Sequence, residues 1–441
     1  MKKTRSPLLK EEYYSTRHTS GLAIFIFPKR NIKKKMATLV TRYGSIDNSF
    51  KAPGRNDLTS VPAGIAHYLE HLMFKKPDGD IMNEFGRWGA VFNALTGHTA
   101  TQYFFIAHKH FTENLTTLIK LAWLPHFPKA NVEHEKSIIE QELKMYQDIP
   151  ELRLLQNLFR NLYHSHPVRF DIGGSLESIK KISDEMIIEC HRTFYHPANM
   201  AMVIVGDLDP ESVLDEVTEL VDQAVNDWKI TPAKTSGPLN IERHFDNEPK
   251  QPRQHYECIE MPVARPLLAI GYKEPHTGLK PTAVITQALL TELTLELILG
   301  KPTKLYQQLY TEGIINNSFG GGYANHETFG LTSIGGETNQ PEKLIDRIKT
   351  GIKQAKKTGF KKRDLLRLKR KHLGHFIRMF DSPDAIASIL FNSYFYHVNP
   401  FDFPRYLKKV TLKEMQDRLN EHLDEKYISI SLVKPLPTTK A

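Results

Sequence analysis

The periodicity of apolar positions predicts a succession of strands and helices in the first half of the chain. Apolar runs indicate strands at 22–29, 36–50, 91–109 (two strands around a glycine turn) and 199–208. Apolar residues three and four apart indicate helices at 62–76, 82–90, 111–123, 131–147, 151–164, 175–180, 183–195 and, after Asp209-Pro210, to about 224. The order is not the strict strand–helix alternation of a doubly wound sheet.

A second succession of elements follows residues 226–254, which are rich in Pro, Lys, Thr and Asn and which we interpret as a linker. Strands are expected at 265–275, 318–337 and 426–436, and helices at 280–299, 302–312, 341–357, 361–380, 383–395 and 411–423. Both halves end on a similar helix and strand, which suggests two related units. We therefore predict an α+β fold with two related domains, 1–225 and 255–441, each a mostly antiparallel sheet with helices packed on one face.

Composition and charge narrow the class of protein. Hydrophobic residues make up 40% and charged residues 25%, as in ordinary globular proteins. The net charge of +9 is dispersed, and we interpret its densest run, 28–36, as a solvated turn between strands rather than a nucleic-acid patch. Cys190 and Cys258 form no disulfide framework, no apolar signal segment is expected at the start of the sequence, and we expect no apolar run long enough to cross a bilayer. We expect a cytoplasmic protein without nucleic-acid or membrane partners.

The predicted helix GIAHYLEHLMF, 64–74, contains three ionisable residues in an otherwise apolar segment. His67 and His71 are four residues apart and share one side of the helix, which is how a helix presents two nitrogens to a zinc ion. Glu70 lies beside them and can take a proton from a water that the metal acidifies. H-x-x-E-H is the inverted zinc-protease motif. A chance match remains open, although the expected burial of the helix makes it less common.

Two histidines leave a zinc site one protein ligand short, and the helix at 131–147 offers a candidate. Glu135 and Glu142 lie in the middle of its apolar stripe, which consists of Val132, Ile138, Ile139, Leu143 and Tyr146. Carboxylates on an apolar face need compensation, and a cation supplies it, although capping or a partner arginine would explain one of them equally well. His98, His108 and His110 are expected to be ordinary surface or strand histidines.

These segments resemble the M16 metallopeptidases (pitrilysin, insulinase and mitochondrial processing peptidase), and most closely the bacterial YmfH-type branch. The resemblance implies a LuxS/metallohydrolase-like fold, one Zn²⁺ per chain on His67, His71 and Glu142, and catalytic roles for Glu70 and, assisting, Glu135. A His₂Glu site also accepts manganese or cobalt.

The family's N-A-x-T strand matches 92–104, which carries Asn93, Ala94 and Thr96 over as expected substrate contacts. An edge strand with a glycine turn is the alternative. The Arg and Tyr that larger members place near the scissile carbonyl are missing here. Tyr310 or Tyr323 would be the substitutes, unless both are core aromatics.

The sequence thus predicts a zinc metalloendopeptidase that acts on peptides or a small precursor protein, with a metal-activated water and Glu70 as the general base. At this length the resemblance implies a homodimer, or a heterodimer with a sister M16 subunit, and a second domain without metal. The alternative is a non-catalytic subunit of a heteromeric complex. A maturation protease of a peptide-antibiotic pathway would use the same chemistry on another substrate.

Overall fold

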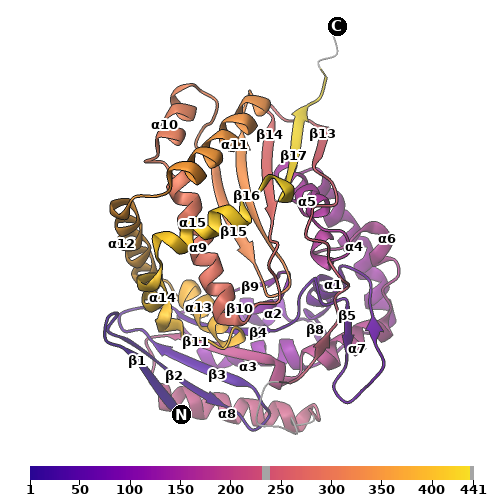
Figure 1. Ribbon diagram of the computed structural model, residues 1–441. Coiled ribbons are helices and arrows are strands. Elements are labelled where there is room, and N and C mark those ends of the chain that lie inside the picture. The colour runs from indigo at the N-terminus through magenta and orange to yellow at the C-terminus, as the bar shows by residue number, and fades with distance from the viewer. Residues whose placement is uncertain (231–238, 438–441) are drawn as a thin grey trace. The chain divides into compact units, whose positions relative to one another are not determined.

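The computed structural model describes residues 1–230 and 239–437, and its contacts divide the chain into two compact units. The first unit comprises Met1–Leu143, Asp171–Phe245 and Ile377–Phe401. The second comprises Lys144–Phe170, Asp246–Phe376 and the chain from Asp402 onward. Figure 1 shows the helices and strands of both units.

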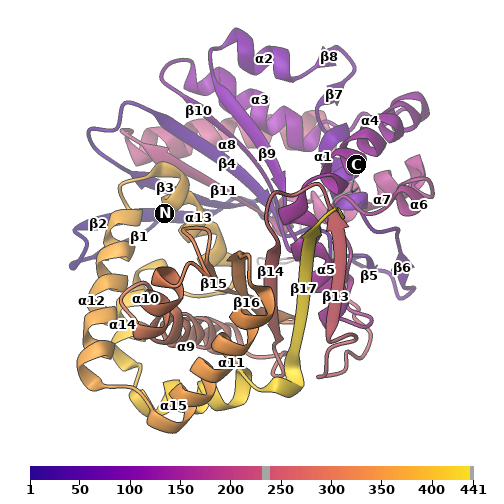
Figure 2. The same ribbon diagram turned by 90° about the horizontal axis from the view of Figure 1, so that it is seen from above.

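A seven-stranded sheet forms the centre of the first unit. Its strands lie in the order β1 (Lys2–Ser6), β2 (Glu11–Arg17), β3 (Ala23–Pro28), β11 (Met200–Gly206), β4 (Lys35–Thr41), β10 (Thr101–Ala107) and β9 (Val91–Thr96). Figure 2 shows these strands side by side. All neighbours are antiparallel except β3 and β11. Small ribbons are made by β5 (Ser49–Lys51), β6 (Thr59–Ser60) and β12 (Glu242–Arg243), and by β7 (Lys75–Lys76) and β8 (Gly79–Asp80).

Helices cover both faces of this sheet. Alternate residues of its central strands point to opposite sides, so each strand offers side chains to the helices on both faces. Ile24 and Ile26 of β3 join the main core. The helices of that unit are α1 (Ile65–Leu72), α2 (Met82–Arg87), α3 (Phe111–Trp123), most of α4 (Lys129–Gln147), α6 (Leu176–Ile179), α7 (Asp184–Phe194) and α8 (Pro210–Asp227). Phe25 points the other way and contacts Tyr394 of α13 (Pro383–Phe395), with ring centroids 5.4 Å apart.

The second unit repeats this plan with a five-stranded sheet. The order is β13 (Tyr256–Met261), β17 (Ile428–Pro435), β14 (Leu267–Lys273), β16 (Gly330–Glu337) and β15 (Gly320–Asn325). Order and strand directions match those of β3, β11, β4, β10 and β9, including the one parallel pair. Its helices are α5 (Pro150–Leu162), α9 (Pro281–Leu299), α10 (Lys304–Thr311), α11 (Pro341–Thr358), most of α12 (Lys362–Met379), α14 (Phe403–Lys409) and α15 (Leu412–His422).

The predicted fold class, two related α+β domains, is confirmed, but each sheet also has a helix on its second face. Helix α5 packs on β14, where a Cβ on Gly271 would lie 2.7 Å from a methyl of Leu158. Helix α13 does the same on β11. Helix α5 thus comes from the first half of the sequence but belongs to the second unit, and α13 comes from the second half but belongs to the first unit. The predicted domains, 1–225 and 255–441, are continuous stretches of chain and do not include this exchange. Residues 231–238 of the predicted linker lie outside the described residues.

Most predicted elements are present, whereas the hairpin β1–β2 and strand β13 were not predicted. The edge strand β1, KKTRS, has no apolar residue, and in the edge strand β13, YECIEM, apolar and polar residues do not alternate strictly.

The expectation that no helix is long enough for a bilayer needs correction. Helix α9 meets that test by length and composition. Eight of its residues are buried, and it packs on β15 and α15, as core helices of globular proteins do.

We predict that Gly64→Ala lowers the free energy of unfolding by about 2 kcal/mol or more. Gly64 precedes α1 with φ of 92°, and a Cβ there would lie 2.3 Å from the main-chain oxygen of Gly173. Urea unfolding measures the change. Gly86→Ala is the control, because Gly86 is helical with open space around it and alanine there should be neutral or stabilising. Equal midpoints for Gly64→Ala and wild type would contradict this packing.

Candidate metal centre

Helix α1 carries the ionisable trio and is buried on most of its surface. Leu69 and Leu72 are fully buried in the core, which fixes the rotation of the helix. His67 and His71, one turn apart, then point to the same side, and their ring centroids are 4.6 Å apart. The prediction of a buried helix that presents two histidines together is confirmed by this geometry.

Helix α4 supplies two carboxylates to the same place. Val132, Ile139 and Leu143 are buried and hold the helix against the core, while the Tyr68 hydroxyl of α1 donates a hydrogen bond to the carbonyl of Val132. Glu135 is buried and Glu142 is partly buried, as the apolar stripe predicted. Ile138 was wrongly included in that stripe and is 38% exposed.

The side chains of His67, His71 and Glu142 converge. One potential ligand atom from each lies within 4.8 Å of the others, and this is the only such group of three among the described residues. Nε2 of His67 and of His71 are 3.9 and 3.3 Å from the two carboxylate oxygens of Glu142. Ligand atoms around a tetrahedral zinc ion, with bonds of about 2.0–2.1 Å, are about 3.3 Å apart. The spacing therefore fits a small cation between the three side chains.

Glu135 contacts the other nitrogen of His71 and not the convergence point. Its Oε1 is 2.9 Å from Nδ1 of His71. A carboxylate in this position fixes the tautomer and orientation of the imidazole and so directs Nε2 toward Glu142. The structure thus gives Glu135 a positioning contact. Nδ1 of His67 is buried and has no hydrogen-bond partner among the described residues.

The charges of the cluster also favour a cation. Burial, and then the charge of His71, lower the pKa of His67 to about 4, so its imidazole is neutral. Burial opposes ionisation of His71, but hydrogen bonds with Glu135 and Glu142 prevail and raise its pKa to about 9. Burial raises the pKa of Glu70, and a hydrogen bond from Thr96 partly offsets this effect. Glu135 and Glu142 thus contact the two nitrogens of His71, and a divalent cation that displaces the proton of His71 would compensate these carboxylates.

Glu70 is held from the side of strand β9. The hydroxyl of Thr96 donates a hydrogen bond to Oε2 of Glu70, and both side chains are buried. Thr101, on the neighbouring strand, donates to the carbonyl of Tyr43 at 2.9 Å and supports this end of the hairpin. Sequence reasoning proposed Thr96 as a substrate contact and missed this bond, although the inward position of Thr96 in the alternating strand 91–96 was the available signal.

Strand β9, which contains Asn93 and Ala94, is the outermost strand of its sheet, so the edge-strand alternative holds structurally. The amide of Ala94 donates to Oδ1 of the preceding Asn93 at 2.9 Å rather than to another strand. The main chain at this edge is therefore positioned to pair with an added strand.

Tyr310 and Tyr323 both belong to the second unit. Tyr310 lies on α10 with 48% of its surface exposed, so it is not a core aromatic. The hydroxyl of Tyr323 donates to Glu274 at 2.7 Å inside a network with Arg418. The described contacts of both tyrosines do not include the cluster of α1 and α4.

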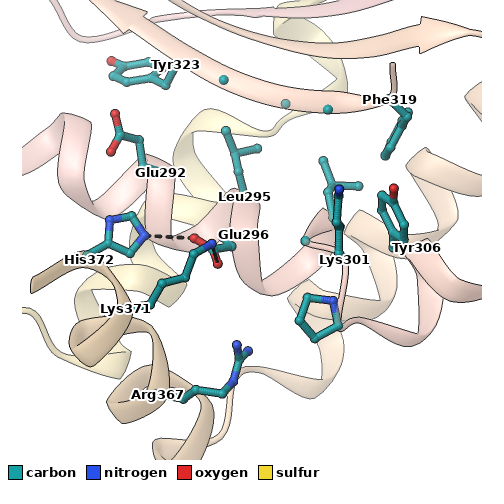
Figure 3. A pocket seen from close by; sticks show the side chains of 16 residues that line it. Glu292, Leu295, Glu296, Lys301, Tyr306, Phe319, Tyr323, Arg367, Lys371 and His372 are labelled. Atoms are coloured by element: carbon teal, nitrogen blue, oxygen red, sulfur yellow. Dashed lines mark hydrogen bonds and ion pairs between the residues drawn. The ribbon is translucent and has the colours of Figure 1, made fainter. Parts of the chain in front are cut away.

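A cavity of about 680 Å³ also lies in the second unit, between α9, α12 and β15 (Figure 3). There Nε2 of His372 is 2.9 Å from Glu296, which also pairs with Lys371. Its carboxylate thus has Lys371 as its ion-pair partner. None of the residues that converge on α1 and α4 lines this cavity.

Comparison with known proteins relates both halves of the chain to one family. Residues 56–174 match the profile described as insulinase (peptidase family M16), and residues 181–371 match that described as the peptidase M16 inactive domain. The chain is 34% identical over 427 residues to the uncharacterized zinc protease YmfH of Bacillus subtilis, covering 97% of each.

Two crystal structures are similar in fold. An M16-like peptidase of Alicyclobacillus acidocaldarius has a TM-score of 0.90 and 30% identity, with 98% of this chain and 100% of that chain covered. A protease of Helicobacter pylori has a TM-score of 0.77 and 21% identity, with 96% and 100% covered.

We predict that Glu135→Leu weakens the affinity for Zn²⁺ about ten- to a hundredfold, measured by competition with a chromophoric chelator. The substitution removes the acceptor that orients His71 while it leaves His67, His71 and Glu142 in place. Glu135→Gln should recover part of the loss, since an amide oxygen still accepts a hydrogen bond. Glu133→Gln, on the exposed side of α4, is the control. If Glu135→Leu binds zinc as tightly as the control, Glu135 does not position His71.

Proposed function

The chain belongs to the M16 peptidase family, and from this premise we propose that it is a zinc-dependent endopeptidase that hydrolyses peptides or a small precursor protein. The convergence of His67, His71 and Glu142 supports this proposal most directly. These three residues would hold one Zn²⁺ per chain, with Glu135 orienting His71.

A bound zinc ion supplies a Lewis acid that polarises the scissile carbonyl and lowers the pKa of water. Glu70 then accepts the proton of the attacking water and delivers it to the nitrogen of the departing amine. Thr96 would hold the Glu70 carboxylate in one orientation through the hydrogen bond from its hydroxyl. Glu70 and Thr96 are buried, whereas His67, His71 and Glu142 are partly exposed, so that water and substrate can reach the cluster.

The substrate would bind as an added strand on β9. The amide of Ala94 would exchange its bond with Asn93 for one with the peptide, and the side chain of Asn93 would then be available to the substrate as well. Main-chain pairing of this kind gives an affinity that depends little on the sequence of the substrate. A peptide bound along β9 would extend to the end of the strand at Thr96, which contacts Glu70. We also propose that the protein forms a dimer, either with an identical chain or with a sister M16 subunit.

A non-catalytic role is the second candidate, because the profile matched by residues 181–371 is described as an inactive domain. Against it, the first unit brings His67, His71 and Glu142 into one cluster, and Glu70 lies on the same helix as the histidines. A subunit that serves only assembly has no need of this buried charge.

The decisive experiment measures metal content and peptide cleavage together. We expect about one zinc per chain in wild type, its loss in His71→Ala and Glu142→Gln, and its retention in Glu70→Gln. Glu70→Gln should lower kcat by about a hundred- to ten-thousandfold because the general base is removed. Glu140→Gln, on the same helix as Glu142, is the matched control.

Folded wild-type protein that takes up no zinc after supplementation would overturn the metal assignment. Zinc uptake without cleavage of any member of a diverse peptide library would instead favour the non-catalytic candidate.

We further predict that Thr96→Val lowers kcat about tenfold or more, with KM and zinc content unchanged. Valine keeps the shape of threonine but cannot hold the Glu70 carboxylate. Thr38→Val is the control, since Thr38 is also a buried strand residue whose hydroxyl donates to a main-chain carbonyl, that of Tyr103 at 3.2 Å. An equal loss in Thr38→Val would mean that Thr96 acts only through stability, and a parallel rise in KM would mean that Thr96 contacts the substrate instead.

A further inference from the structure

One end of the first sheet gathers several chain connections that the proposed peptidase activity does not use. Strand pairing places them together: Gly206 pairs with Pro28, Lys35 with Ala107, and Ser6 with Glu11. The turn 7–10, the loop 29–34 and the connection 108–110 therefore lie at the same end of the sheet. Thr96 lies at the opposite end of β9, since Ile106 pairs with Val91 and Thr101 with Thr96.

These connections form a surface that we name the basic rim: Lys10, Arg30, Lys33, Lys34 and Lys109. All five side chains are exposed, and none has an ion-pair partner among the described residues. Lys29 is already neutralised by Glu11. Lys35 lies over the ring of Phe111, 5.6 Å from its centroid.

Few carboxylates face the basic rim. Glu113 pairs with His110, and Asp209 accepts the amide of Ser212 at the start of α8. Asp207 is exposed beside them. The excess of positive charge is therefore local, although cations are dispersed along the sequence, because strand pairing brings three separate segments together.

Apolar side chains lie among these cations. Leu8, in the turn between β1 and β2, is 57% exposed, and Arg5 and Lys10 flank it. Ile32 lies in the loop with Lys33 and Lys34. On the side of β10 and β9, the Trp88 and His110 rings are 5.3 Å apart, with Arg87 over Trp88. Aliphatic turn tips, an indole and flanking lysines are the composition of peripheral membrane-binding surfaces.

We propose that the basic rim docks the first unit on the surface of an anionic lipid bilayer. The lysines and arginine would lie among phosphate headgroups, while Leu8 enters the boundary between headgroups and acyl chains. Nucleic acid would satisfy the cations equally well, but its phosphate backbone offers no gain for an exposed leucine at a turn tip. The leucine thus favours lipid.

This proposal departs from the expectation of no membrane partner, and it does not rest on the peptidase proposal. It involves a surface contact and not helix α9, which belongs to the core of the second unit. A surface of this kind would bring the protein to substrates at a membrane.

The test is co-sedimentation of the full chain with vesicles of phosphatidylcholine alone or with 30% phosphatidylglycerol. We expect binding only to the anionic vesicles, weakened by salt. The double variant Lys33→Gln/Lys34→Gln should lower the partition coefficient about thirtyfold, and Leu8→Ser about tenfold. Lys361→Gln/Lys362→Gln removes the same charge from an exposed site in the second unit and should stay within twofold of wild type.

Three results would overturn the proposal: no binding to anionic vesicles, equal weakening by the Lys361/Lys362 control, or no effect of Leu8→Ser. A single-stranded oligonucleotide is tested in parallel. Tighter binding of the oligonucleotide than of the vesicles, lost in Lys33→Gln/Lys34→Gln and kept in Leu8→Ser, would assign the basic rim to nucleic acid instead.

Discussion

The candidate site depends on one constraint: carboxylates that are buried where α4 packs against α1 lose their contact with water and need another partner. Glu135 and Glu70 are both buried, and they lie on the two helices whose apolar side chains join the core. A buried carboxylate without compensation is costly, and each here has a specific partner, His71 for Glu135 and Thr96 for Glu70. Nε2 of both histidines and Glu142 remain directed at one point. The packing that stabilises the first unit therefore also creates an electrostatic environment that favours a divalent cation.

The second unit shows how the same architecture is stable without such a site. Helices α9 and α12 occupy the places in its strand order that α1 and α4 occupy in the first unit. There the carboxylate, Glu296, comes from the first helix, and its partners, Lys371 and His372, come from the second. Ion pairs thus compensate the charge directly. A related fold holds a potential metal site in one unit and ordinary ion pairs in the other, and the difference lies in a few side chains.

Much of the fold follows from local sequence. The periodicity of apolar residues located nearly all helices and the central strands, because a helix or strand with one buried face records that burial in its own pattern. The edge strands β1 and β13 escaped this reasoning, since β1 carries only polar residues and the apolar residues of β13 do not alternate regularly with polar ones. The exchange of α5 and α13 between the halves of the chain was also invisible, because an apolar helix face does not indicate which sheet it will cover.

The sequence by itself determined that His67 and His71 share one side of α1, and that Glu135 and Glu142 share one side of α4, because both facts follow from helical geometry. The family resemblance implied that Glu142 joins both histidines, but the geometry of that meeting, the contact of Glu135 with Nδ1 of His71 and the inward turn of Thr96 to Glu70 are visible only in the tertiary structure. These contacts join residues that are far apart in the chain. Their geometry is set by the packing of large buried side chains around them, which no local pattern encodes.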